Sequence, residues 1–221
     1  THLHGDVTLI GTPDYGLEGC PPGYYNSPVI VRRDDPRTTL ADFEEARFAY
    51  NETGSQSGFA SIYNTVKPQG FWFADRVHSG GHVASAQMVA EGRAELAALD
   101  AVTWKLIQRY DGFAADLRVL DWTKPTPGLP YIAAAGADQT GMFAAVREAI
   151  GGLAAEDRDA LSLRGFVAIP AQDYLAEKWN VNAARHAGGW TRHDSNIGPA
   201  PEHQHQLRIS RIIPRGEQAR S

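Results

Sequence analysis

Two short loops built from small and hydroxyl-bearing residues carry the clearest chemistry in this sequence. The first, at residues 51–58 (N-E-T-G-S-Q-S-G), places hydroxyl groups at Thr53, Ser55 and Ser57 between a strand-like run and a helix-like run. A helix start offers unpaired backbone N–H groups and a partial positive charge, and small residues let an anion approach them. The loop contains no Lys or Arg, and this arrangement binds an oxyanion without either. The alternative is an ordinary capped helix with Ser55 as the cap.

The second loop, Ser79-Gly80-Gly81-His82, repeats this design with a histidine. A turn of small residues again precedes a helix-like run, and His82 falls near the first turn of that helix. An imidazole donates one or two hydrogen bonds, depending on its protonation state, so His82 is a candidate donor to the same oxyanion. The alternative is a surface histidine at a helix cap.

Asp100 directly follows the apolar run Leu96–Leu99, so we expect it at the same sheet edge as the two loops. A carboxylate beside an anion makes chemical sense when the ligand carries an acidic proton, because the carboxylate accepts that proton in a hydrogen bond. Such a site disfavours fully deprotonated or fully esterified anions. The alternative is that Asp100 caps the following helix.

The elements that must position these residues alternate along the chain. The strand-like runs are Val7–Ile10, Val29–Val31, Phe48–Tyr50, Trp72–His78, Leu96–Leu99, Leu117–Trp122 and Tyr131–Ala134. The helix-like runs are Leu40–Ala46, Gln56–Val66, His82–Glu91, Thr103–Tyr110, Met142–Ala154 and Asp157–Leu163. This alternation predicts an α/β fold with largely parallel sheets. Ligands bind such sheets at the carboxyl ends of strands, where both loops lie.

Composition and missing motifs exclude several other classes of function. The chain has 221 residues, a net charge of −5 and one cysteine, Cys20. These values give no reason to expect an internal disulfide, a cysteine metal cluster or a nucleic-acid partner. No Gly-x-Ser-x-Gly nucleophile turn and no Gly-x-x-x-x-Gly-Lys-Ser/Thr phosphate loop occurs. We therefore expect no catalytic residue, no metal site and no cofactor.

The two ends of the sequence differ from its middle. No signal peptide opens the chain and Thr1 lies just before a strand-like run, so we expect that the natural N-terminus is missing. From Trp179 onward regular periodicity stops, which predicts an irregular tail at 179–221. Four of the eight histidines fall there, but their spacing fits no compact set of metal ligands (His186, His193, His203 and His205).

Taken together, these stretches resemble the phosphate/phosphite/phosphonate-binding proteins of ABC transporters. The resemblance runs from about Val7 to Pro170, and its strongest motifs are the loop Ser55–Gly58 and the turn Gly81-His82. Further matching segments are Gly11–Tyr15 (G-T-P-D-Y), Gly23–Ser27 (G-Y-Y-N-S) and Thr126–Pro130 (T-P-G-L-P).

The resemblance implies a type 2 periplasmic-binding-protein fold, with two α/β lobes joined by a two-strand hinge. Lobe 1 would comprise residues 1–28 and 130–178 and be incomplete, lobe 2 would comprise 29–129, and the hinge would lie at 26–31 and 119–131. The implied ligand-binding residues are Tyr25, Ser55, Gln56, Ser57, His82 and Asp100. A packed turn aromatic is the alternative for Tyr25.

The chain also departs from the family pattern in three places. The family's first strand–helix–strand unit is absent, Gln56 stands where a hydroxyl residue is common, and the tail after about Tyr174 differs. The different residue at position 56 predicts a changed ligand preference.

The function implied by the resemblance is that of a solute-binding component of an ABC importer. It would bind phosphonate, phosphate, phosphite or a related oxyanion, act as a monomer and deliver the ligand to a membrane permease. Its location would be periplasmic or membrane-associated outside the cytoplasm, with a cytoplasmic location left open. The rivals are a cofactor-biosynthesis enzyme and a ligand-sensing domain on the same fold.

Overall fold

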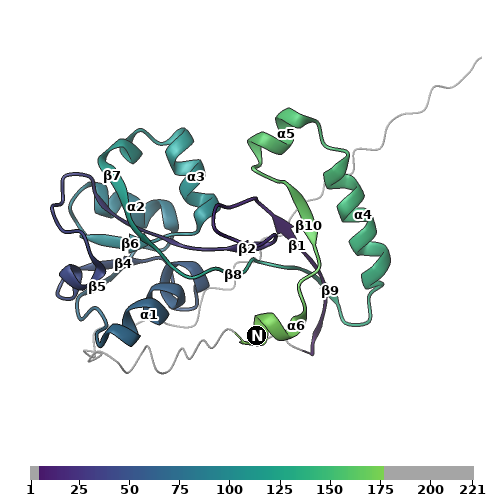
Figure 1. Cartoon of the computed structure of the whole chain (residues 1–221), viewed down its shortest axis with the longest axis horizontal. Helices are drawn as coiled ribbons and strands as arrows, with labels where there is room; N and C mark the ends of the chain where they lie inside the picture. Colours follow the sequence, from purple (N-terminus) through teal and green to yellow (C-terminus); the bar gives the residue numbers. More distant parts are fainter. Residues whose placement is uncertain (1–4, 177–221) are drawn as a thin grey trace, which may run out of the picture. The chain divides into compact units, whose positions relative to one another are not determined.

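The computed structural model describes residues 5–176, so the predicted tail at 179–221 and its histidines lie outside the described residues. The larger group of elements forms around a five-stranded sheet with the order β5-β4-β6-β3-β7. Its strands are β3 (Pro28–Arg32), β4 (Phe48–Tyr50), β5 (Arg76–His78), β6 (Leu96–Ala98) and β7 (Leu117–Trp122). These elements are coloured blue to teal in Figure 1. They correspond to the predicted lobe 2.

Both faces of this sheet are buried. Each central strand sends alternate side chains to opposite faces, so its residues join a core cluster on each side. Val29 and Val31 pack with Phe48 in one core cluster, whereas Ile30 and Ala49 belong to a second cluster. The first cluster is covered by α1 (Ser61–Val66) and the second by α2 (His82–Ala90) and α3 (Ala101–Tyr110). The sheet is therefore held between two layers of helices.

Three neighbouring strands of this sheet are parallel, and they set the position of the predicted loops. β4 pairs in parallel with both β5 and β6. The carboxyl ends of all three strands consequently meet at one edge, where Asn51, Ser79 and Asp100 follow them in sequence. The expected position of the two loops and Asp100 at a common edge is confirmed.

The prediction of largely parallel sheets is wrong. β3 is antiparallel to both β6 and β7, so the sheet is mixed. The reason is connectivity: β3 brings the chain into this lobe and β7 takes it out, so the two strands run in opposite directions. In the other lobe, β1 (Val7–Asp14) is antiparallel to both of its neighbours, β9 (Tyr131–Ala134) and β10 (Gly165–Val167).

That three-stranded sheet, β10-β1-β9, forms the centre of the second lobe. Its main helix is α4 (Gln139–Gly151), which begins with Asp138 accepting a hydrogen bond from the Gly141 amide at 3.0 Å. α5 (Ala155–Ala160) and α6 (Ala171–Ala176) follow. Ile10 on β1, Ile150 on α4 and Phe166 on β10 share a buried cluster. β10 and α6 were not predicted from the sequence.

A short antiparallel pair links the two groups of elements. β2 (Tyr24–Tyr25) pairs with β8 (Thr126–Pro127), and the Ser27 amide donates to the Thr123 hydroxyl at 3.0 Å. β8 lies inside the proline-rich stretch at 124–130. β8 lies inside the second predicted hinge region, 119–131, whereas β2 ends one residue before the first, 26–31.

Several short elements differ from the sequence prediction. The expected strand Trp72–His78 is confined to β5, because the aromatic residues 71–73 pack in the core instead of joining the sheet. The expected helix Leu40–Ala46 is a 3₁₀ turn, η1 (Leu40–Phe43). The predicted helix Gln56–Val66 has the right extent, but it opens with a π-helical turn, η2 (Gln56–Ala60). Two further 3₁₀ turns are η3 (Lys67–Gln69) and η4 (Gly112–Asp116).

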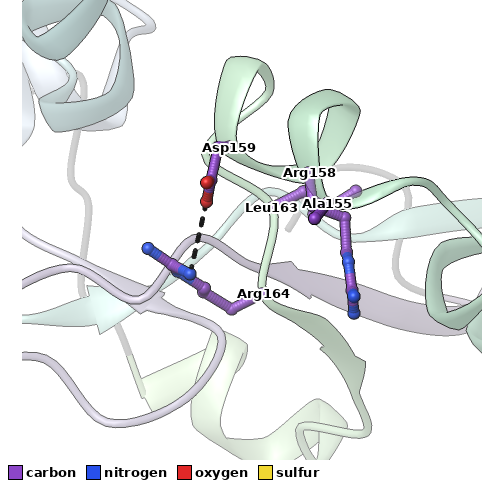
Figure 2. A pocket seen from close by; sticks show the side chains of 5 residues that line it. All are labelled: Ala155, Arg158, Asp159, Leu163 and Arg164. Carbon is purple, nitrogen blue, oxygen red and sulfur yellow. Dashed lines mark ion pairs between the residues drawn. The ribbon is translucent and has the colours of Figure 1, made fainter.

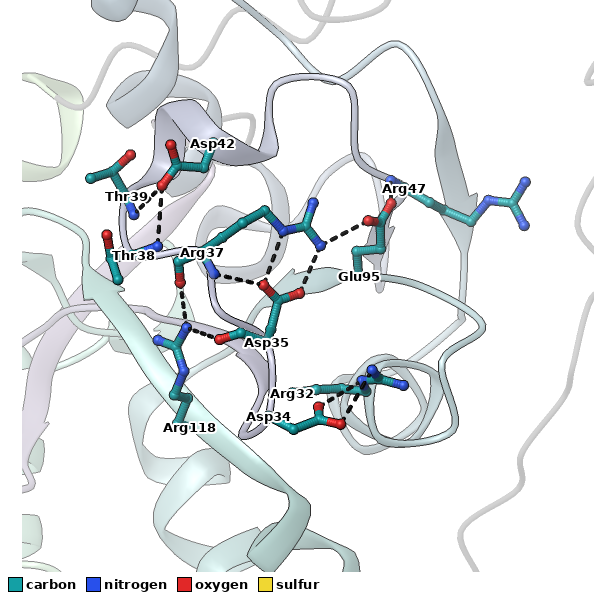
Figure 3. A network of polar contacts seen from close by, with 10 residues as sticks. All are labelled: Arg32, Asp34, Asp35, Arg37, Thr38, Thr39, Asp42, Arg47, Glu95 and Arg118. Atoms are coloured by element: carbon teal, nitrogen blue, oxygen red, sulfur yellow. Dashed lines mark hydrogen bonds and ion pairs between the residues drawn. The ribbon is translucent and has the colours of Figure 1, made fainter.

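A polar network fastens the segment between β3 and η1 to the rest of lobe 2 (Figure 3). The Arg37 guanidinium donates to both carboxylate oxygens of Asp35, at 3.0 and 2.7 Å, and to Glu95 at 2.8 Å. Arg118 on β7 donates to the Asp35 carbonyl at 2.9 Å. This network lies beyond the carboxyl end of β3, which is the sheet edge opposite the two loops.

Candidate functional site

The first loop forms a capped helix start directly after β4. Ser55 is the N-cap of η2, and its hydroxyl accepts a hydrogen bond from the Gly58 amide at 3.0 Å. Ser55 therefore caps the helix, which was the alternative interpretation of this residue. The cap fixes the first turn, in which Ser57 is only 7 % exposed.

The second loop is tied to the same edge by Ser79. The Ser79 amide and hydroxyl both donate to the Tyr50 carbonyl, at 2.9 and 3.0 Å. Ser79 Oγ also lies 2.6 Å from Ser85 Oγ on α2. Gly80 has φ of 82°, a left-handed conformation that favours glycine. This turn directs His82, the first residue of α2, toward the first loop.

Ser57 and His82 meet directly. Ser57 Oγ lies 3.1 Å from His82 Nε2, a hydrogen-bond distance between residues that are 25 positions apart in sequence. This contact joins the two predicted loops into one cluster of donors. Because either atom can carry the shared proton, the pair can present an O–H or an N–H group to a ligand.

His82 is partly buried, and burial favours the neutral form of its ring. Burial lowers the pKa of the His82 imidazole below its ordinary value of 6.5, and the nearby Asp100 carboxylate opposes this effect in part. Desolvation disfavours the protonated ring. His82 is therefore neutral at pH 7 and acts as a hydrogen-bonding group.

Three polar side-chain atoms around the first loop are buried and lack a hydrogen-bond partner within the described residues. They are Gln56 Nε2, Asn51 Oδ1 and His82 Nδ1. Buried polar groups in native proteins are nearly all paired, so such atoms commonly mark sites that are completed by a ligand or water. Gln56 and His82 were predicted as site residues, whereas Asn51 was not.

Asp100 is the N-cap of α3, which is the alternative given for this residue in the sequence analysis. Its Oδ1 accepts hydrogen bonds from the Thr103 amide at 2.8 Å and from the Thr103 hydroxyl at 3.2 Å. Both bonds use Oδ1, so the cap leaves Oδ2 unused by the helix. Asp100 lies at the same sheet edge as the Ser57–His82 pair, and its charge partly opposes the lowering of the His82 pKa.

Two tyrosines lie near the Asp100 end of α3. Tyr25 is 5 % exposed and packs with Leu17 and Ala101 in a small buried cluster, which matches the alternative of a packed aromatic residue. Tyr15 borders the same cluster. Burial raises the pKa of the Tyr15 hydroxyl, and Tyr131 and Asp100 raise it further.

Tyr15 and Asn51 are the neighbours of the site that sequence reasoning missed. Each directly follows the end of a strand, β1 for Tyr15 and β4 for Asn51. That position was a usable signal for Asn51, because it is also the feature that identified Ser79 and Asp100. It was not usable for Tyr15, because the predicted strand ended at Ile10 and the observed strand ends at Asp14.

A pocket lies along α5 and the segment that follows it (Figure 2). Its volume is about 400 Å³, and its lining residues are Ala155, Arg158, Asp159, Leu163 and Arg164. Asp159 and Arg164 form an exposed ion pair at 3.5 Å, which contributes little energy. None of the predicted site residues lines this pocket.

Two searches of the described residues gave negative results. Residues 5–176 contain no group of three or more His, Cys, Asp or Glu side chains arranged to hold a metal ion. No helix in the same range combines the length and apolar character needed to cross a membrane.

Comparison with protein families identifies the class of this protein. The family model described as "ABC transporter, phosphonate, periplasmic substrate-binding protein" matches residues 4–174. The chain belongs to this family. Members of this periplasmic substrate-binding family are binding proteins and not enzymes, and family membership implies a small-molecule ligand, a membrane permease partner and an extracytoplasmic location.

Solved structures agree with a periplasmic-binding-protein fold. A Xanthomonas citri protein with bound chloride has a TM-score of 0.64 at 17% identity, over 83% of this chain and 73% of that chain. PhnD1 from Prochlorococcus marinus in complex with methylphosphonate has a TM-score of 0.62 at 15% identity, over 76% and 68%.

A third structure is a binding-protein component of an ABC phosphonate transporter from Pseudomonas aeruginosa. Its TM-score is 0.57 at 19% identity, over 77% of this chain and 59% of that chain. At these identities the likeness establishes the fold alone. A search of curated protein sequences found no match.

Proposed function

We propose that this phosphonate-family binding protein is the solute-binding component of an ABC importer. It binds a small oxyanion, such as a phosphonate, phosphate or phosphite, and releases it unchanged. The observation that carries the proposal is the 3.1 Å contact between Ser57 Oγ and His82 Nε2, which joins two helix starts at one sheet edge.

The donors around this contact suit a phosphorus oxyanion. The backbone amides at the start of η2 supply N–H groups, the Ser57–His82 pair adds one side-chain donor, and neither loop contains Lys or Arg. A site of neutral donors holds an anion by directed hydrogen bonds, which is how a phosphonate oxygen is recognised without a formal ion pair.

Asp100 supplies the selectivity in this proposal. Its Oδ2 accepts the acidic proton of a singly protonated ligand, while Oδ1 stays on the helix cap. A ligand without such a proton would bring its negative charge against the carboxylate. The site thus favours monoanionic forms over fully deprotonated ones.

Family membership supports an extracytoplasmic location and a permease partner, and the monomeric state and lobe closure are part of this proposal. The ligand is captured outside the cytoplasm by a monomer whose lobes close about the β2–β8 connection, and the closed form docks on the permease. Tyr25 and Gln56 complete the proposed set of ligand-binding residues with Ser55, Ser57, His82 and Asp100.

The decisive experiment is calorimetric titration of methylphosphonate, phosphate and phosphite into wild-type protein and Ser57→Ala. We expect Ser57→Ala to raise Kd by about 10- to 100-fold, because one hydrogen bond to a charged group is lost. The control is Thr65→Val, which removes a hydroxyl that donates to the Ser61 carbonyl at 2.8 Å on the same helix.

Three outcomes would count against the proposal. Equal weakening by Ser57→Ala and Thr65→Val would mean that Ser57 has no special role. Absence of binding for all three anions would refute the ligand class. Chemical conversion of any of them would favour the enzyme alternative, and phosphorus NMR of the titration mixture detects it.

A further inference from the structure

The carboxamide of Asn51 and the imidazole of His82 both lie against Gly58 of the first loop. A Cβ atom added to Gly58 would lie 1.9 Å from Asn51 Oδ1 and 3.0 Å from His82 Cε1. Asn51, Gly58 and His82 therefore meet at a single point. A larger residue at position 58 would displace the amide of Asn51.

The atoms that face this point are unsatisfied. Asn51 Oδ1 and His82 Nδ1 are both buried without a hydrogen-bond partner in the described part of the chain. His82 is held from its other side by Ser57, through the contact to Nε2. The ring thus contacts the Ser57 hydroxyl through Nε2, while Cε1, the carbon between its two nitrogens, lies beside Gly58 as Asn51 Oδ1 does.

We propose that Asn51 is a positioning residue that sets the orientation of the His82 ring for ligand binding. Its amide and the Cε1 edge of the ring both lie against Gly58, so the amide limits how far the imidazole can turn away from Ser57. The inference rests on the proposed function, in which His82 donates a hydrogen bond to the oxyanion. Asn51 itself acts through His82.

Two variants remove this support in different ways. Asn51→Ala deletes the amide, whereas Gly58→Ala keeps the amide but displaces it from its position beside Gly58. Gly58→Ala also introduces a better helix former, so it covers the case in which Asn51→Ala folds poorly. The matched control is Asn64→Ala, which removes an exposed amide from α1.

The first measurement needs no ligand. Nitrogen-15 NMR of the two His82 ring nitrogens reports how the ring is hydrogen-bonded. We expect one dominant tautomer in the wild-type protein and in Asn64→Ala, and shifts closer to those of a free histidine in Asn51→Ala and Gly58→Ala. A purely structural role for Asn51 would leave these shifts unchanged.

The second measurement is calorimetric titration of methylphosphonate and inorganic phosphate into the same variants. We expect Asn51→Ala and Gly58→Ala to raise Kd by about tenfold, the scale of one hydrogen bond to a charged group, with Asn64→Ala within twofold of wild type. Unchanged ring shifts together with Kd values within twofold would overturn the proposal. If the wild-type protein binds neither anion, the proposed function fails, while the ring shifts still decide the role of Asn51.

Discussion

His82 combines two properties that are normally separate: it is a hydrogen-bonding group of the proposed site, and it is a partly buried titratable group. Its Nε2 contacts Ser57 at 3.1 Å, and burial lowers its pKa. A ring that must stay neutral to remain buried makes the folded state sensitive to acid. The site and the stability of the protein are thereby coupled through one residue.

This coupling predicts how stability changes with pH. The pKa of His82 is lower in the folded protein than the ordinary value of 6.5, so below about pH 6.5 the unfolded chain binds a proton that the folded chain does not. The stability contributed by neutral His82 is complete above that pH. It is lost as the pH falls toward the lowered folded value.

The matching variant is His82→Gln, which keeps hydrogen-bonding capacity but does not titrate. Thermal unfolding at pH 7.5 and 5.5 should show a larger loss of Tm in the wild-type protein than in His82→Gln. His78→Gln serves as the control, because His78 is exposed and pairs with Glu52 at 3.2 Å. Equal losses in wild type and His82→Gln would contradict the stated pKa direction.

At the scale of elements, two polar devices tie the ends of strands in lobe 2 to neighbouring segments. Near the site, Ser79 ties the second loop to the end of β4. At the opposite edge, Arg37 links Asp35 to Glu95, the residue before β6 (Figure 3). This hydrogen bond from Arg37 lowers the pKa of the Asp35 carboxyl.

Arg37→Ala tests the second device. Asp35 is 11% exposed and Arg37 30% exposed, so the variant leaves a shielded carboxylate unpaired. We expect the free energy of unfolding in urea to fall by about 1–3 kcal/mol, the usual cost of removing a charged hydrogen-bond partner. Arg93→Ala breaks the more exposed pair with Glu91 (53% and 58%) and should change it by less than about 0.5 kcal/mol. Similar losses for both variants would remove the special role of Arg37.

At the scale of the whole molecule, the important quantity is the free energy that ligand binding adds to the folded state. The folded protein binds the ligand and the unfolded chain does not, so saturation raises stability by mass action. Each lobe has its own core, and the short β2–β8 pair connects the two lobes.

Thermal shift therefore gives a screen for the ligand. At a ligand concentration of 100 times Kd the gain is about 2.7 kcal/mol, which corresponds to a rise in Tm of about 5–10 °C for a protein of this size. Methylphosphonate, phosphate, phosphite and sulfate should be compared at the same ionic strength. Sulfate has no acidic proton at neutral pH, so we expect it to give the smallest rise, and an equal rise would argue against proton acceptance by Asp100.

The sequence by itself was enough to predict the alternation of strands and helices. It also predicted the two small-residue loops that contain the candidate residues Ser57 and His82. These features depend on local rules: periodicity of apolar residues, turn-forming glycines and the position of a residue directly after a strand. The likeness to the binding-protein family followed from the same local motifs and is confirmed.

Only the tertiary structure decided the rest. Strand direction depends on how the chain enters and leaves a lobe, so the antiparallel β3 was not readable from apolar runs. Asn51 gained its place beside His82 because Gly58, seven residues later, leaves room for its amide. Local patterns fix which elements form, whereas contacts between distant residues depend on packing that no single segment encodes.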